Sequence, residues 1–146
     1  PGWKLVDPTL SASESIILQG GIDPNLSILV LLRGKRTVEI SAEAFSQHEQ
    51  IFERSLASVM RGSILDALSS NGMAVAAATD DQEALRICNL SIASGAIAAG
   101  ISGSGPSIAI VCFQDDSTSL SKLFSESGLG VISTGIYVKD EISGVQ

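Results

Sequence analysis

A glycine-rich segment in the second half of the chain holds the residues best suited to bind a ligand. Residues 100–107 read Gly-Ile-Ser-Gly-Ser-Gly-Pro-Ser, and the apolar segment Ile108–Phe113 follows directly. Glycine lacks a Cβ and reaches positive φ without penalty, so such a loop brings backbone N–H groups close to a bound group. Loops of this kind bind phosphates and other anions. A tight turn without any ligand explains the same residues, because glycine-rich turns are common.

A short basic segment is the second place where charge gathers. Residues 33–36 read Arg-Gly-Lys-Arg, which fits either a solvated turn between strands or a contact for an anionic substrate. His48 is the only histidine, and Cys88 and Cys112 have no metal or redox spacing, so neither a catalytic triad nor a zinc site is expected. Both cysteines are expected to be buried free thiols in a reducing compartment.

Composition narrows the class of protein. The chain has 146 residues, of which 45% are hydrophobic and 17% charged, as expected for one globular domain with a real core. A net charge of −7 argues against a nucleic-acid partner, because no Lys/Arg cluster could neutralise a phosphate backbone. With neither a long apolar run nor a signal-peptide pattern, the sequence predicts a soluble, cytoplasmic protein without a membrane partner.

Hydrophobic periodicity predicts the elements before the glycine-rich segment. Short strands are expected at residues 3–6 and 15–18, and a strand covered on both faces at Leu26–Leu32, with a further strand at 37–40. A helical apolar stripe then runs over residues 41–68, with an interruption around Gly62.

The elements around the glycine-rich segment follow from local signals. Asn71 and Gly72 are expected to stop or bend the preceding helix. Either Thr79 or Asp80 is expected to cap the next helix, which would continue through small residues up to the glycine-rich segment. After the strand Ile108–Phe113, the pattern predicts an amphipathic helix at 117–127 and a final strand at 131–138.

This order of elements predicts an α+β fold. It fits a ferredoxin-like sandwich, with a mostly antiparallel sheet and helices on one face. In a dinucleotide-binding domain the glycine motif follows a strand and opens a helix, whereas here a helix is expected before it and a strand after it. The sequence of a P-loop is absent as well.

Residues 100–107, with the Ile-Ala-Ile-Val that follows, resemble the third signature of the GHMP kinase superfamily, G-x-x-G-x-G-P-x. Asn-Gly-Met-Ala at residues 71–74 and Ser-Gly-Ala-Ile-Ala-Ala-Gly at 94–100 are similar to segments of the archaeal-type shikimate kinases. The resemblance covers residues 26–138 and is strong over 71–111. It implies that residues 25–146 form the carboxy-terminal domain of such a kinase, and that residues 1–24 lead in from the amino-terminal half or the interdomain region.

The resemblance implies transfer of the ATP γ-phosphoryl group to the 3-hydroxyl of shikimate, a step of aromatic amino-acid biosynthesis. The family's second signature, P-x-x-x-G-L-G-S-S-A, does not occur in this chain. ATP and Mg²⁺ would therefore be bound through an amino-terminal half, and this half alone is expected to be inactive, with no catalytic residue and no metal ligand. Its partners would be shikimate and that other half, and an uncovered apolar face would favour a homo-oligomer.

The site residues that the resemblance implies belong to the loop beside the substrate and the phosphates. They are Gly103, Ser104, Gly105, Pro106 and Ser107. Secondary candidates are Ser102, also explained as a turn hydroxyl bonded to its own backbone, Asn71 as a substrate contact, and Arg33 as a ligand of the acceptor carboxylate. Homoserine kinase or mevalonate kinase is the alternative within the superfamily. A non-catalytic ferredoxin-like regulatory or interaction module is the alternative outside it.

Overall fold

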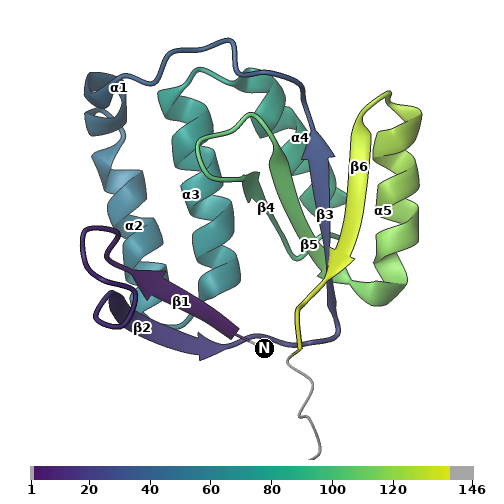
Figure 1. The fold of residues 1–146 in the computed structure, drawn as a ribbon. Helices are drawn as coiled ribbons and strands as arrows, with labels where there is room; N and C mark the ends of the chain where they lie inside the picture. The colour runs from purple at the N-terminus through teal and green to yellow at the C-terminus, as the bar shows by residue number, and fades with distance from the viewer. Residues whose placement is uncertain (1, 139–146) are drawn as a thin grey trace, which may run out of the picture.

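The computed structural model describes residues 2–138, which form six strands and five helices (Figure 1). In chain order they are β1 (Gly2–Val6), β2 (Ile16–Gly21), β3 (Leu26–Leu32), α1 (Ala42–Ser46), α2 (Glu49–Met60), α3 (Ile64–Ala78), α4 (Gln82–Ala93), β4 (Ala98–Ile101), β5 (Ile108–Phe113), α5 (Gln114–Glu126) and β6 (Gly130–Gly135). Over this part of the chain, the helices are too short or too polar to cross a membrane.

Four of the strands form one antiparallel sheet in the order β4-β5-β3-β6. From β3 onward the chain alternates strand, helices, two strands, helix and strand, which is the ferredoxin-like topology. The predicted α+β sandwich is therefore confirmed. In the register, Leu31 of β3 lies between Ile108 of β5 and Val131 of β6, so their side chains share one face.

The main core lies between that face and the helices. Leu29 and Leu31 of β3 are fully buried there, together with Leu120 and Phe124 of α5 and residues of α3 and α4. On the opposite face a smaller apolar cluster forms around β3 and the amino-terminal half of α3, and Val30 is only half-buried. The apolar run of β3 predicted that both faces of this strand are buried. In the structure, the second face is only partly buried.

Helix α3 packs directly on the backbone of strand β4. A Cβ on Gly72 would lie 2.3 Å from the Cα of Gly100, and a Cβ on Gly100 would lie 2.5 Å from the carbonyl oxygen of Leu68. The hydroxyl of Ser69 accepts the backbone N–H of Ala99 at 3.2 Å. The prediction that Asn71 and Gly72 end a helix is therefore wrong, because both lie inside α3, where Gly72 permits this close approach.

The predicted helix through the small residues before the glycine-rich segment is also wrong. Helix α4 ends at Ala93, where Gly95 at φ +106° closes a Schellman motif with the bonds Gly95 N–H to Ile92 and Ala96 N–H to Ser91. The residues that follow form the buried strand β4. The glycine-rich loop therefore connects two antiparallel strands, and the expected order of helix before and strand after does not hold.

Four further features differ from the predictions. Residues 37–40 form no strand, and the helical stripe over 41–68 is divided into α1, α2 and the start of α3. Helix α5 begins at Gln114, directly after β5, and β6 ends at Gly135, short of the predicted end at residue 138.

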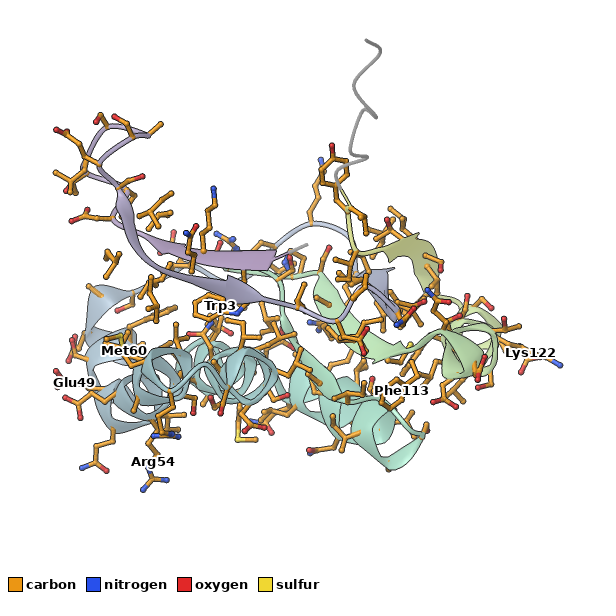
Figure 2. All side chains as sticks on the ribbon, turned by 90° about the horizontal axis from the view of Figure 1, so that it is seen from below. Trp3, Glu49, Arg54, Met60, Phe113 and Lys122 are labelled. Carbon is orange, nitrogen blue, oxygen red and sulfur yellow. The ribbon has the colours of Figure 1, made fainter. Side chains whose placement is uncertain are left out.

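The β1–β2 hairpin forms a small sheet of its own across the ends of α2 and α3 (Figure 1). Trp3 lies on the side of the hairpin that faces the helices, in the region of Met60 (Figure 2). Its indole ring covers Gly20, where a Cβ would come within 2.8 Å of ring atoms. The assignment of residues 1–24 to a lead-in segment stays a prediction.

The contact between α3 and β4 predicts that Gly72→Ala destabilises the fold. In a free helix this change would stabilise by about 1 kcal/mol. Here the new Cβ meets backbone atoms that cannot move aside alone, so we expect a net loss of about 3 kcal/mol in the free energy of unfolding, measured by urea denaturation. Asn71→Ala, at the exposed neighbouring position of the same helix, is the control and should change stability little. Equal stability of the Gly72→Ala and Asn71→Ala variants would contradict the packing role.

Candidate functional site

The end of β3, the β4–β5 loop and the start of α4 lie at the same end of the molecule (Figure 1). Residues of these three segments line a cleft of about 360 Å³. Its walls are residues 33–38, residues 79–83 and part of the β4–β5 loop. The volume falls within the range of roughly 300–1,000 Å³ that is typical of small-molecule sites. The two segments that sequence composition had marked, the basic turn (residues 33–36) and the β4–β5 loop (residues 102–107), thus face the same space.

The β4–β5 loop is closed by its own backbone. The N–H of Ser102 donates to the carbonyl of Ser107 at 2.8 Å, and the N–H of Gly105 donates to the carbonyl of Ser102 at 3.1 Å. Gly103 and Gly105 have φ values of +61° and +85°, which glycine reaches without strain. Within residues 2–138, the N–H groups of Gly103 and Ser104 donate to no backbone carbonyl outside the helices and strands. They are therefore available to an oxyanion.

Only some of the predicted site residues line the cleft. Ser104, Gly105 and Pro106 line it. The other loop residues, among them Gly103 and Ser107, belong to the same turn without lining the cleft, and Ser102 is exposed at its start. Asn71 is exposed in the middle of α3 and does not line the cleft either.

Arg33 is held by a set of internal partners, here called the Arg33 cluster. Its two terminal nitrogens donate to both carboxylate oxygens of Asp81 at 2.7 Å, and one of them reaches Glu83 at 2.8 Å. The other nitrogen also donates to the carbonyl of Pro106 at 3.1 Å. The side chain is 8% exposed, and its Nε is buried without a partner. Arg33 therefore has no free pair of donors for a substrate carboxylate, in contrast to its predicted role.

Asp81 joins the Arg33 cluster to the start of α4. Its Oδ1 accepts the backbone N–H of Ala84 at 2.9 Å, which makes Asp81 the N-cap. The predicted caps are wrong, because Thr79 bonds back to the carbonyl of Val75 and Asp80 accepts the side chain of Gln82. The hydrogen bonds from Arg33 lower the pKa of Asp81 below its ordinary value of 3.8, more than burial raises it.

Arg36 makes a different set of contacts. One terminal nitrogen donates to the hydroxyl of Ser104 and to the carbonyl of Gly105, the latter at 3.2 Å. Both acceptors are neutral. Among the described residues, neither Lys35 nor Arg36 has a carboxylate within ion-pair distance. The basic turn is thus bound to the β4–β5 loop through Arg36 and to α4 through Arg33.

Sequence reasoning missed the carboxylates that hold Arg33. Asp81 and Glu83 are 48 and 50 residues away from it, and no local pattern links them. The only sequence signal was the acidic segment 80–83, which was interpreted through helix capping. That interpretation located the start of α4 but not the contact of its N-cap residue Asp81 with Arg33.

Within residues 2–138, neither the cysteines nor the possible metal ligands are arranged for redox chemistry or metal binding. Cys112 is buried, and Cys88 is only half-buried; both are free thiols, and burial raises the pKa of Cys88 to about 11. Residues 2–138 contain no group of three side chains able to hold a metal ion. Because Arg33 holds both Asp81 and Glu83, these carboxylates do not fit the Mg²⁺ that the family resemblance implies.

Solved structures of small-molecule enzymes share this fold. Homoserine kinase from Cytophaga hutchinsonii aligns with a TM-score of 0.51 and 17% identity over 88% of this chain and 46% of that chain. Mevalonate kinase from Staphylococcus aureus aligns with a TM-score of 0.57 and 14% identity over 83% and 44%. Mevalonate pyrophosphate decarboxylase from Streptococcus pyogenes aligns with a TM-score of 0.56 and 12% identity over 89% and 50%.

These likenesses establish the fold, and they match the fold that the sequence resemblance implied. The chain spans about half the length of the solved proteins that it matches. No family model and no curated protein sequence matches it. Because kinases and a decarboxylase share this fold, the fold alone does not determine the reaction.

The Arg33 cluster predicts that Asp81→Asn destabilises the protein by about 3 kcal/mol, because it leaves a buried guanidinium without its bidentate partner. Since the pKa of Asp81 is lowered in the folded state, its contribution is present above the ordinary aspartate pKa and is lost as the pH falls through the lowered value. Urea denaturation of both proteins from neutral to acidic pH should show the difference in stability shrinking only at the acidic end.

Asp80→Asn is the matched control for this substitution. It removes the same charge from the neighbouring residue, which is exposed at φ +50°, a conformation that asparagine tolerates. Its stability should stay within about 0.5 kcal/mol of the wild type. Equal losses for the two variants would mean that local charge, rather than the Arg33 cluster, stabilises this end of the molecule.

Proposed function

We propose that this chain is the carboxy-terminal half of an ATP-dependent kinase of the GHMP type, which phosphorylates a hydroxyl group of a small hydroxy acid, with shikimate as the acceptor. The observation that carries the proposal is the cleft in which the β4–β5 loop meets the basic turn. Its loop carries the signature that resembles the superfamily, and kinases of known structure share the fold around it.

The two walls of the cleft fit different parts of such a reaction. Phosphoryl transfer depends on positioning and on stabilisation of negative charge more than on covalent chemistry. The N–H group of Ser104, which lines the cleft, is free to contact a phosphate oxygen, and the basic turn supplies positive charge beside it. Residues 2–138 hold no group of three side chains that could bind Mg²⁺, so the proposal assigns ATP phosphates and Mg²⁺ chiefly to the amino-terminal half.

The choice of shikimate rests on the sequence segments around residues 71–74 and 94–100. In the structure these segments meet at the contact of Gly72 with Gly100, so packing accounts for part of their pattern. Shikimate, homoserine and mevalonate each carry a hydroxyl and a carboxylate, and the cleft chemistry fits all three. The acceptor therefore has to be decided by assay, with shikimate as the expected substrate.

The remaining parts of the proposal follow from the same assignment. The enzyme would act in the cytoplasm in aromatic amino-acid biosynthesis, with its amino-terminal half as the obligatory partner. Exposed apolar side chains such as Leu56 and Met60 on α2 are compatible with self-association of the isolated half.

The proposal predicts ATP-dependent turnover only when this chain is joined to, or mixed with, the segment that carries the Gly-Leu-Gly-Ser-Ser-Ala signature. We expect phosphorylation of shikimate, measured as ADP release and as formation of the phosphate ester, and no turnover by the 146-residue chain alone. Homoserine and mevalonate are assayed in parallel. Turnover of one of these two instead would correct the acceptor, and turnover of none would refute the kinase assignment.

The assembled enzyme should also respond to a change in the β4–β5 loop. Gly105→Ala places a Cβ at φ +85° and 3.2 Å from the side chain of Ile101, so the loop must shift. We expect kcat/KM to fall at least about tenfold, a change of about 1.4 kcal/mol in the barrier. Gly128→Ala, at φ +86° with open space around it and outside the cleft, carries the same backbone strain. It should lose stability without losing activity, and an equal loss of activity in both variants would argue against a role for the loop.

A further inference from the structure

The three cations of the basic turn differ in what binds them. Arg33 is buried and ion-paired to Asp81 and Glu83. Arg36 donates only to uncharged oxygens of the β4–β5 loop, and no ion pair of Lys35 occurs among the described residues. Two positive charges at the cleft thus lack a negative partner, although the chain as a whole carries a net charge of −7.

The contacts of Arg36 leave much of its guanidinium free. Its two hydrogen bonds use a single terminal nitrogen, so the second terminal nitrogen and Nε remain for another acceptor. A hydrogen bond to a charged acceptor is roughly twice as strong as one to a neutral acceptor. An oxyanion that enters the cleft would therefore compete successfully with the hydroxyl of Ser104.

From these contacts we infer that Arg36, supported by Lys35, forms an oxyanion subsite at the cleft, and that Arg33 is the positioning residue that holds the turn in place. The ligand group is a carboxylate or phosphate oxygen pair that replaces Ser104 as a partner of Arg36. The inference rests on the proposed function only for the origin of that group, an acceptor carboxylate or a phosphoryl group. The subsite itself follows from the geometry of this chain.

The Arg33 cluster explains why the subsite belongs to Arg36. By pairing with Asp81 and Glu83, Arg33 shields Arg36 and Lys35 from the two carboxylates that would otherwise attract them. Its bond to the carbonyl of Pro106 also fixes the exit of the β4–β5 loop. Asp80 is the remaining carboxylate that lines the cleft.

The test is a titration of the isotope-labelled 146-residue chain, followed by its backbone amide NMR signals at low ionic strength. The probes are malonate, a dicarboxylate, and inorganic pyrophosphate. We expect both probes to shift the signals of residues 103–105, and Arg36→Gln to weaken their binding at least about tenfold. Tighter binding of malonate would assign the subsite to an acceptor carboxylate, and tighter binding of pyrophosphate to a phosphoryl group.

Two variants separate ligand binding from a merely structural contact. Arg54→Gln removes the same charge from an exposed arginine that projects outward from α2, and it should leave probe binding unchanged (Figure 2). Ser104→Ala removes the internal partner of Arg36 but keeps the guanidinium, so the probes should bind at least as tightly as to the wild type.

The inference is overturned if neither probe shifts the loop signals, if Arg36→Gln and Arg54→Gln weaken binding equally, or if Ser104→Ala weakens binding as much as Arg36→Gln. The titration requires neither ATP nor the other half of the proposed enzyme. Its outcome is therefore independent of the turnover assay. The oxyanion subsite can be refuted while the kinase assignment stands, and the reverse also holds.

Discussion

The backbone contact between α3 and β4 determines where the elements around the cleft can lie. Strand β4 is at the edge of the sheet, where unpaired backbone groups would be exposed. Because Gly72 and Gly100 have no Cβ, the helix covers this edge at backbone distance, and Ser69 accepts the N–H of Ala99. The contact fixes the path of β4, and β4 in turn directs the loop that follows it toward the end of β3.

The Arg33 cluster then joins the three segments that border the cleft. One guanidinium binds the N-cap of α4 through Asp81, the first turn of α4 through Glu83 and the β4–β5 loop through Pro106. Burial of a charge is unfavourable unless it is paired and hydrogen-bonded, and the bidentate bonds to Asp81 meet that condition. Removal of Asp81 would leave the buried guanidinium with only the exposed Glu83 and the carbonyl of Pro106 as partners. Through these three acceptors the side chain of Arg33 links the basic turn to the two other walls of the cleft.

The sequence predicted the architecture better than the contacts that position the site. Hydrophobic periodicity was sufficient for the antiparallel α+β sandwich, whereas the small residues up to Ala99, and with them the first half of the four-residue strand β4, were predicted as helical because alanine favours helices. All four residues of β4 are buried between α3, α4 and β5, and the absence of a Cβ at Gly100 lets α3 approach the strand closely, so packing overrides local propensity. Composition alone marked both the basic turn and the glycine-rich loop. The pairing of Arg33 with Asp81 could not be predicted, because it depends on a fold that brings residues 48 positions apart together.

The uneven distribution of charge makes the proposed anion subsite compatible with an acidic chain. At physiological ionic strength, screening limits electrostatic attraction to about 8 Å, so a ligand in the cleft senses the nearby charges rather than the net charge of −7. In the cleft, Asp81 and Glu83 are both ion-paired to the buried side chain of Arg33. Positive charge from Lys35 and Arg36 then lies beside the free N–H groups of the β4–β5 loop. Anion binding at the proposed subsite would thus be a local property, because Arg33 is ion-paired to Asp81 and Glu83 while Arg36 has no ion pair among the described residues.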